Sequence, residues 1–98
     1  MNRRQIGCLI GVLILLSWVS VTIAGTVSDE ARRYMARGMA AVEMAKSPGD
    51  YSLAILEFEQ AAKLAPDWPN VHYNLGNVHS ILGDFTSAIK SYQRYLDL

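Results

Sequence analysis

The feature that most constrains this chain is an internal repeat at an offset of 34 residues. The segment DYSLAILEFEQAAKL, which begins at Asp50, aligns with DFTSAIKSYQRYLDL, which begins at Asp84. Acidic, aromatic, small and branched residues recur in the same order in both segments. Self-similarity at a fixed period of this size indicates a repeat protein, in which each unit buries its apolar side against its neighbours.

Helical periodicity and helix-breaking residues predict four helices after the N-terminal segment. The first runs through EARRYMARGMAAVEMAK, with Thr26 expected as its N-cap, and it ends at SPGD. The second starts near Asp50 or Ser52 and ends at APDWPN. The third and fourth cover 71–82 and 86–98, with Gly-Asp between them.

The pattern resembles the tetratricopeptide repeat. The residues that carry the resemblance are Ala54, Phe58, Ala61 and Pro66 in the first unit, and Leu75, Gly76, Gly83, Ala88 and Tyr92 in the second. The resemblance implies an all-α fold, made of the antiparallel helix pairs of a short α-solenoid. An apolar N-terminal helix is expected to precede it, from the uncharged stretch near the start of the chain. The repeats occupy about 31–66 and about 69–98 of a domain expected at 26–98.

Three small residues in the second unit have expected structural roles. In the family, small residues lie where two antiparallel helices cross, and Gly76 and Ala88 match those sites. A bulky replacement at either site is expected to separate the helices, at a cost of about 1 to 3 kcal/mol. Gly83 is expected to end the third helix with a positive φ, which a residue with a Cβ resists.

The N-terminal segment 1–25 is expected to be a signal peptide or a membrane anchor. Arg3 and Arg4 precede a long uncharged stretch, a pattern that holds the N-terminus on the cytoplasmic side. The apolar part, 6–23, spans about 18 residues, between a usual signal-peptide core and a spanning helix. Small residues favour cleavage before Gly25 over a retained anchor. The protein is therefore expected to be exported and periplasmic, or anchored in the cytoplasmic membrane.

Composition excludes several function classes. After the apolar segment the chain carries seven Lys and Arg against nine Asp and Glu, without a basic stripe for nucleic acid. Cys8 is the single cysteine, so no intramolecular disulfide forms. No nucleophile, base and orienting group occur together, and no glycine-rich phosphate loop precedes a helix. We therefore expect a protein that is not an enzyme and that holds no cofactor.

Two other residue sets are better explained by packing than by a site. His72 and His79 stand about 10 Å apart along one helix, too far to bind a single metal ion. They are expected to replace aromatic packing residues, and no metal site is predicted. The three methionines of the first helix are expected to fill its core, although Met side chains also suit a groove for an apolar partner.

The resemblance implies a partner-binding surface, because the first helix of each pair lines a concave face that receives an extended peptide. The matching residues on the third helix are Asn70, Tyr73, Asn77, Ser80 and Ile81. Asn77 is expected to bind peptide backbone through both ends of its amide. The other interpretation of these residues is a solvated surface without a partner.

The leading functional prediction is an exported interaction module that binds a protein or peptide, with no nucleic acid, and touches the membrane through its N-terminal segment if this is uncleaved. The alternative is a homo-oligomer, or a fragment of a longer array or envelope complex, that self-associates through its last helix, with Tyr95 in the contact. A third interpretation is a non-catalytic domain of a larger enzyme or secretion component.

Overall fold

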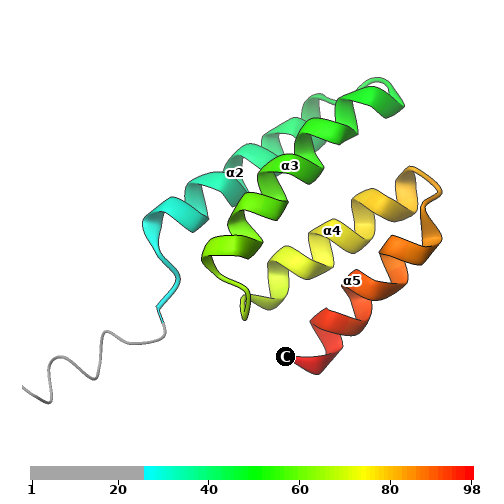
Figure 1. The fold of residues 1–98 in the computed structure, drawn as a ribbon. Helices are drawn as coiled ribbons and strands as arrows, with labels where there is room; N and C mark the ends of the chain where they lie inside the picture. Colours follow the sequence, from blue (N-terminus) through cyan, green and yellow to red (C-terminus); the bar gives the residue numbers. More distant parts are fainter. Residues whose placement is uncertain (1–25) are drawn as a thin grey trace, which may run out of the picture.

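The computed structural model describes residues 26–98, which form four α-helices and no strand. The helices are α2 (Asp29–Met44), α3 (Pro48–Leu64), α4 (Pro69–Ile81) and α5 (Phe85–Asp97) (Figure 1). The all-α prediction is confirmed for this part of the chain. The expected signal or anchor segment, with its apolar stretch 6–23, lies outside the described residues. No described helix is both long and apolar enough to cross a membrane.

α2 starts at Ser28 and not at the expected N-cap, Thr26. The hydroxyl of Ser28 accepts a hydrogen bond from the backbone N–H of Ala31 at 3.2 Å. The two acidic residues that directly follow Ser28 lie in the first turn, where negative charge interacts favourably with the helix dipole. The expectation for Thr26 is therefore wrong. The helix ends at Met44, two residues before the expected end.

α3 begins at Pro48, earlier than the expected start near Asp50 or Ser52. Pro48 takes the first helical position, where its missing N–H has no intrahelical partner. The carboxylate of Asp50 accepts hydrogen bonds from the backbone N–H groups of Lys46 at 2.9 Å and Ser47 at 3.1 Å. These bonds, led by the one from Lys46, lower the pKa of Asp50 below its ordinary value. The proline that prevents one helix from continuing thus starts the next.

The turn between α4 and α5 depends on Gly83, which has the expected positive φ of 77°. Its N–H donates to the carbonyl of Ser80 at 3.1 Å, and the N–H of Asp84 donates to the carbonyl of His79 at 2.9 Å. This pair of bonds is the Schellman arrangement, which satisfies carbonyls at a helix end. The interpretation of Gly83 as the helix terminator is confirmed.

The second helix pair also starts earlier than predicted. α4 begins at Pro69, two residues before the expected start, and α5 begins at Phe85, one residue before it. Asp84 caps α5, because its Oδ1 accepts a hydrogen bond from the N–H of Ser87 at 3.2 Å. Hydrogen bonds from Ser87 lower the pKa of Asp84. A charged N-cap of this kind fixes the first turn of the helix.

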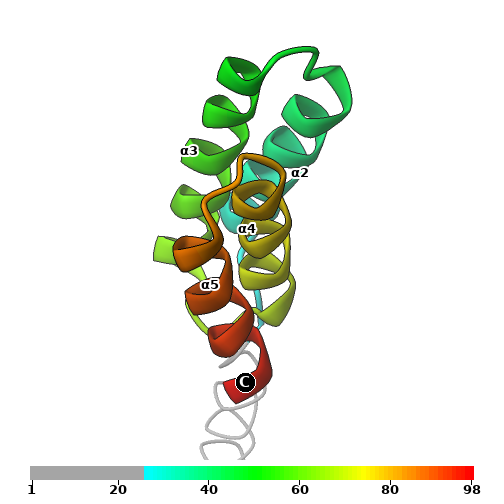
Figure 2. The same ribbon diagram turned by 90° about the vertical axis from the view of Figure 1, so that its right-hand side faces the viewer.

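The four helices form two antiparallel pairs, α2 with α3 and α4 with α5, and α3 packs against α4 to join them (Figure 1). A view turned by 90° places α2 and α4 toward one side of the molecule and α3 and α5 toward the other (Figure 2). The described residues therefore adopt the expected arrangement of a short α-solenoid.

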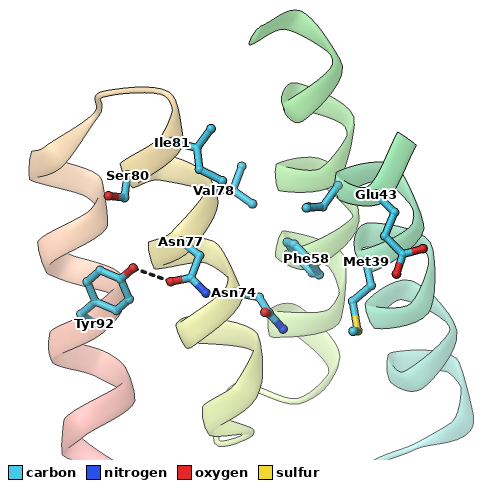
Figure 3. Close-up of a pocket in the computed structure, with 10 residues that line it drawn as sticks. Met39, Glu43, Phe58, Asn74, Asn77, Val78, Ser80, Ile81 and Tyr92 are labelled. Carbon is cyan, nitrogen blue, oxygen red and sulfur yellow. Dashed lines mark hydrogen bonds between the residues drawn. The ribbon is translucent and has the colours of Figure 1, made fainter. Parts of the chain in front are cut away.

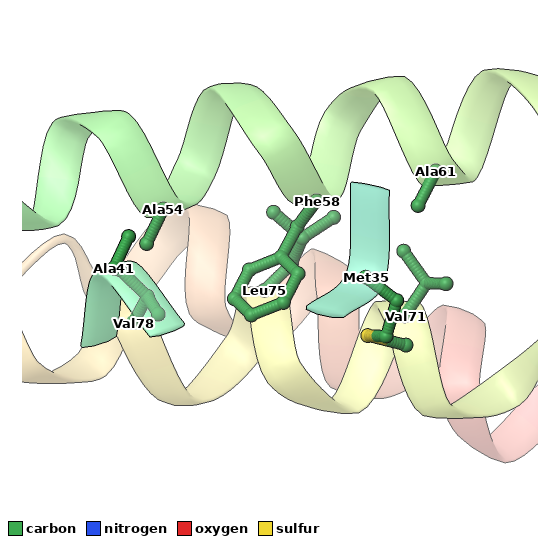
Figure 4. Close-up of a cluster of buried hydrophobic side chains, with 8 residues drawn as sticks. All are labelled: Met35, Ala41, Ala54, Phe58, Ala61, Val71, Leu75 and Val78. Carbon is green, nitrogen blue, oxygen red and sulfur yellow. The ribbon is translucent and has the colours of Figure 1, made fainter. Parts of the chain in front are cut away.

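The core is formed by α2, α3 and α4. Phe58 projects from α3 into its centre and is 1% exposed (Figure 4). The residues of this cluster are Met35, Ala41, Ala54, Phe58, Ala61, Val71, Leu75 and Val78. From α5 only Ala88 is buried. The core is thus centred on the first pair and the helix that follows it.

Two glycines each make room for an aromatic ring. A Cβ at Gly76 would lie 2.5 Å from Cε1 of Tyr92, and a Cβ at Gly38 would overlap the ring of Phe58. Such contacts are too short for carbon atoms, so each glycine lets a ring lie directly against helix backbone. The prediction placed Gly76 at a crossing of backbones. The structure shows that Gly76 instead faces a side chain, while Ala88 is buried in the contact between α4 and α5.

Candidate functional site

A hollow of about 540 Å³ opens between α2 and α4 (Figure 3). We call it the main groove. Its wall is largely apolar, with the buried ring of Phe58 behind and Met39 at the front, half exposed. The residues that line it are Met39, Val42, Glu43, Phe58, Asn74, Asn77, Val78, Ser80, Ile81 and Tyr92. A groove of this size suits side chains of a bound ligand.

A second hollow, of about 470 Å³, lies next to the main groove and reaches the loop between α3 and α4. Met39 and Asn74 line both hollows, so the two adjoin. The residues that line the second hollow are Met35, Met39, Trp68, Asn70, Tyr73, Asn74 and Tyr95. The side of the molecule formed by α2 and α4 is therefore hollowed over most of the length of α4.

The five residues predicted to bind a partner all line these hollows. Asn77, Ser80 and Ile81 line the main groove, and Asn70 and Tyr73 line the second hollow. The structure thus brings the predicted set to one side of α4. That they bind a partner stays a prediction.

One end of the Asn77 amide already makes a hydrogen bond within the protein. Its Oδ1 accepts a hydrogen bond from the hydroxyl of Tyr92 at 2.5 Å, and Figure 3 shows this oxygen turned toward α5. Oδ1 has a second lone pair, so binding of peptide backbone through both ends of this amide stays a prediction. The nitrogen is the end without a hydrogen-bond partner in the described residues.

Asn74 belongs to the site but was missed by the sequence analysis. Its Nδ2 donates to the sulfur of Met35 at 3.3 Å. A thioether can only accept, so this contact fixes the nitrogen toward Met35 and leaves Oδ1 of Asn74 as the available acceptor. A signal was present in the sequence, because Asn70, Asn74 and Asn77 recur at helical spacing on one face.

The main groove carries negative charge. Glu43 is the charged residue in its wall, and none of the described lysines and arginines lines either hollow. Glu43 is exposed and makes no ion pair among residues 26–98. It lies in the last turn of α2, which has no basic residue to offset the partial negative charge of a helix C-terminus. The groove therefore favours cationic over anionic groups.

Comparison with protein families assigns this fold. A family model described as TPR repeat matches residues 46–80, and one described as tetratricopeptide repeat matches residues 69–98. Together they cover more than half of the chain and include α3, α4 and α5. The chain belongs to the tetratricopeptide repeat family. No curated protein and no solved structure matches it.

Tetratricopeptide repeats generally mediate protein–protein interactions, and proteins built from them are generally non-catalytic scaffolds. Within residues 26–98, no group of three or more His, Cys, Asp or Glu side chains is placed to hold a metal ion.

Tyr95 lies on the hollowed side of the repeats, contrary to the sequence interpretation that separated it from Tyr73. The ring centroids of Tyr73 and Tyr95 are 5.4 Å apart, and those of Tyr73 and Tyr92 are 6.1 Å apart. These tilted pairs join α4 to α5, and Tyr73 and Tyr95 both line the second hollow. A change at Tyr95 would therefore disturb the hollowed side as well, and it cannot test self-association alone.

The two histidines make polar contacts in addition to packing. Nε2 of His72 lies 2.7 Å from the carbonyl oxygen of Pro66, to which it donates, and so ties α4 to the exposed loop before it. Nδ1 of His79 lies 3.8 Å from the carboxylate of Asp84. Both rings are half-buried. Neither histidine faces the main groove or the second hollow.

The second repeat exposes an apolar stripe on α5. Phe85, Ile89 and Leu96 lie on one face of this helix and are 63%, 55% and 77% exposed. We call these three residues the α5 stripe. It faces away from the hollows, because none of its residues lines them. An apolar face of this length is a surface that another helix can cover.

Proposed function

We propose that this chain is a non-enzymatic module that binds an extended segment of another protein in the main groove and second hollow. The observation that carries the proposal is the complementary pair of amide groups in the groove. Asn74 offers an acceptor, and Asn77, one turn later, offers a donor. A peptide unit needs both, since each residue of an extended chain carries one N–H and one C=O.

The spacing of the two amides fits this interpretation. Residues three apart on a helix have Cβ atoms about 5 to 6 Å apart. In an extended chain the N–H and C=O of one residue point to the same side, so two neighbouring amides on one helix face can pair with both groups. Backbone bonds made in this way hold a peptide in register without reading its sequence. The apolar wall beside them then receives a side chain of the peptide.

The test is selection of peptides from a random nonapeptide library by the full 98-residue chain, purified in a non-ionic detergent. The double variant Asn74→Ala, Asn77→Ala is expected to lose most of the selected binders. The matched control is Gln93→Ala on the exposed surface of α5, which is expected to keep them. Equal recovery on all three proteins would show that the groove does not bind peptide backbone.

We also propose that the module acts outside the cytoplasm. The support is the sequence pattern at the N-terminus, where Arg3 and Arg4 precede a long uncharged stretch. Cleavage before Gly25 would release a periplasmic protein, and retention of 6–23 would anchor it to the cytoplasmic membrane. The intact mass of the protein recovered from cells decides between these forms. Recovery of the uncleaved protein in the cytoplasmic fraction would contradict export.

The second candidate function is self-association or continuation of the repeat stack through the α5 stripe. The α5 stripe occupies the repeat positions at which α3 carries residues covered by the next helix pair. This equivalence favours a further helix or a second copy as the cover of the stripe. Tyr51, Ile55 and Ala62 of α3 are partly buried and packed against the core. Sedimentation of the full chain, compared with its Ile89→Glu variant, tests it. A monomer in both cases would exclude self-association through the stripe.

A further inference from the structure

We infer that the main groove selects peptides in which a large apolar side chain lies close in sequence to a basic one, and that it discriminates against acidic peptides. The inference rests on the proposed function, because it names the chemistry of the segment bound there. It is carried by two features of the groove wall that the backbone contacts do not use, namely an adaptable apolar pocket and a single unpaired carboxylate.

The apolar part of the peptide would enter between α2 and α4. Figure 3 shows Met39 on one side of the groove and Val78 and Ile81 on the other, with Phe58 behind. Met39 is 50% exposed although most of its neighbours in the wall are apolar. A flexible thioether side chain at the entrance adapts to the shape of what enters. Leucine, methionine or phenylalanine would each bury enough apolar surface here to anchor a peptide.

The charged part of the peptide would lie at the end of the groove where α2 ends. Glu43 stands there without an ion-pair partner, and the carbonyls at the end of α2 add to its negative potential. The N-termini of α3 and α5 lie at the same end of the molecule. Their positive partial charge is offset by the carboxylates of Asp50 and Asp84.

Lys46 lines a neighbouring hollow between the α2–α3 loop and the end of α4, which shares Ile81 with the main groove. Lys90 acts electrostatically on Asp84 at this end. Neither lysine lines the main groove.

A carboxylate of a bound peptide would therefore meet Glu43 with no basic side chain in the groove wall to balance it. A lysine or arginine would instead pair with Glu43 over apolar surface. Pairs between partly exposed charges are weak, so we expect replacement of the basic residue by an acidic one to lower affinity about three- to tenfold at low salt. The difference should shrink at high ionic strength, where charges are screened within a few ångström.

The experiment repeats the nonapeptide selection with four full-length proteins in non-ionic detergent: the unchanged chain, Glu43→Gln, Glu43→Lys and the control Lys46→Gln. The unchanged chain should enrich a basic residue within two positions of a large apolar one. Glu43→Gln should keep the apolar preference and lose the basic one, and Glu43→Lys should enrich acidic residues instead. Lys46→Gln should leave the basic preference in place.

The affinity of one selected peptide and of its lysine-to-glutamate exchange, measured by fluorescence anisotropy at low and high salt, then gives the fold-change directly. No enrichment of basic residues on the unchanged chain, or enrichment that persists on Glu43→Lys, would overturn the inference. If peptides are selected without charge preference but depend on Asn74 and Asn77, only this inference fails. If no selected peptide depends on those asparagines, the proposed function fails with it.

Discussion

The two helix pairs repeat the same contact and use it differently. In the first pair Gly38 accommodates the ring of Phe58, and in the second Gly76 accommodates the ring of Tyr92. Phe58 is 1% exposed and lies in the core, whereas Tyr92 is half-buried and donates a hydrogen bond to Asn77 in the main groove. One repeat position thus serves packing in the first pair and orients a site residue in the second.

The outer surfaces of the pairs differ in a second way. The side of α3 that carries Ile55 is covered, while Ile89, its counterpart on α5, is 55% exposed. At the other end of the stack, α2 carries Arg33 and Arg37 where α4 carries the buried Val71 and Leu75. The described solenoid therefore has a polar outer surface on α2 and an apolar one on α5, which limits where another helix can add.

The largest expected difference between the pairs comes from removal of their aromatic rings. Phe58→Ala should lower the free energy of unfolding by about 3 to 5 kcal/mol because it leaves a cavity in the core. Tyr92→Ala should cost about 2 kcal/mol, since its ring is half-buried. Urea unfolding followed by circular dichroism measures both, with Phe58→Leu as a milder variant that stays folded. Equal losses would mean that the two pairs share one core.

The second-largest difference is expected when a glutamate is placed on the matching surfaces of α3 and α5. Ile55→Glu is expected to lower the free energy of unfolding by about 2 kcal/mol, because the position is packed against the core. Ile89→Glu should change it by less than about 0.5 kcal/mol in the monomer. Thermal unfolding at low protein concentration measures the contrast. A large loss in Ile89→Glu that grows with concentration would indicate that the stripe is covered by another copy.

The glycine between α4 and α5 and the glycine in the first turn of α3 should differ in their response to alanine. Gly83→Ala is expected to cost about 1 to 2 kcal/mol, because a Cβ opposes the positive φ of this residue. Gly49→Ala, in the first turn of α3, meets open space and should stabilise the helix by up to about 1 kcal/mol. Unfolding midpoints in urea give the sign of each change. Loss of stability in both variants would contradict the separate roles of these glycines.

The smallest effect concerns the carboxylates that start α3 and α5. The pKa values of Asp50 and Asp84 are below the ordinary value of 3.8, so their stabilising effect is present above that pH and is lost as the pH falls below it. The Tm should therefore fall between about pH 4 and pH 2. Asp84→Asn and Asp50→Asn should each flatten this fall in part. If the double variant shows the same fall of Tm with pH as the unchanged chain, other carboxylates cause that fall.

Much of the fold was predictable because local rules decide it. Helical periodicity and helix-breaking residues predicted the number and order of the described helices, and Gly83 ended its helix as expected. Helix starts were less predictable. Asp50 and Asp84 align in sequence, yet Asp84 is an N-cap and Asp50 lies inside the first turn of α3. Pro48 causes this difference, because it provides an earlier start with no counterpart in the second repeat.

The site was predictable only in part. The resemblance indicated the face of α4 that lines the hollows, but it did not reveal Asn74 or Glu43. Met39 was expected to fill the core and is instead 50% exposed in the wall of the main groove. Those residues enter the groove because α2 and α4 lie side by side, and their distance in the chain gives no local signal of that contact. The bond that fixes the amide of Asn77 likewise depends on a tyrosine fifteen residues away.

The sequence by itself determined the repeat architecture, since periodicity, glycines and prolines act through neighbouring residues along the chain. Only the tertiary structure decided which atoms of the asparagines are available, where negative charge collects and which apolar surface is left uncovered. The physical reason is that hydrogen-bond pairing and burial are properties of side chains brought together from different helices. A repeated residue therefore keeps its place in the fold while its partners, and with them its function, change.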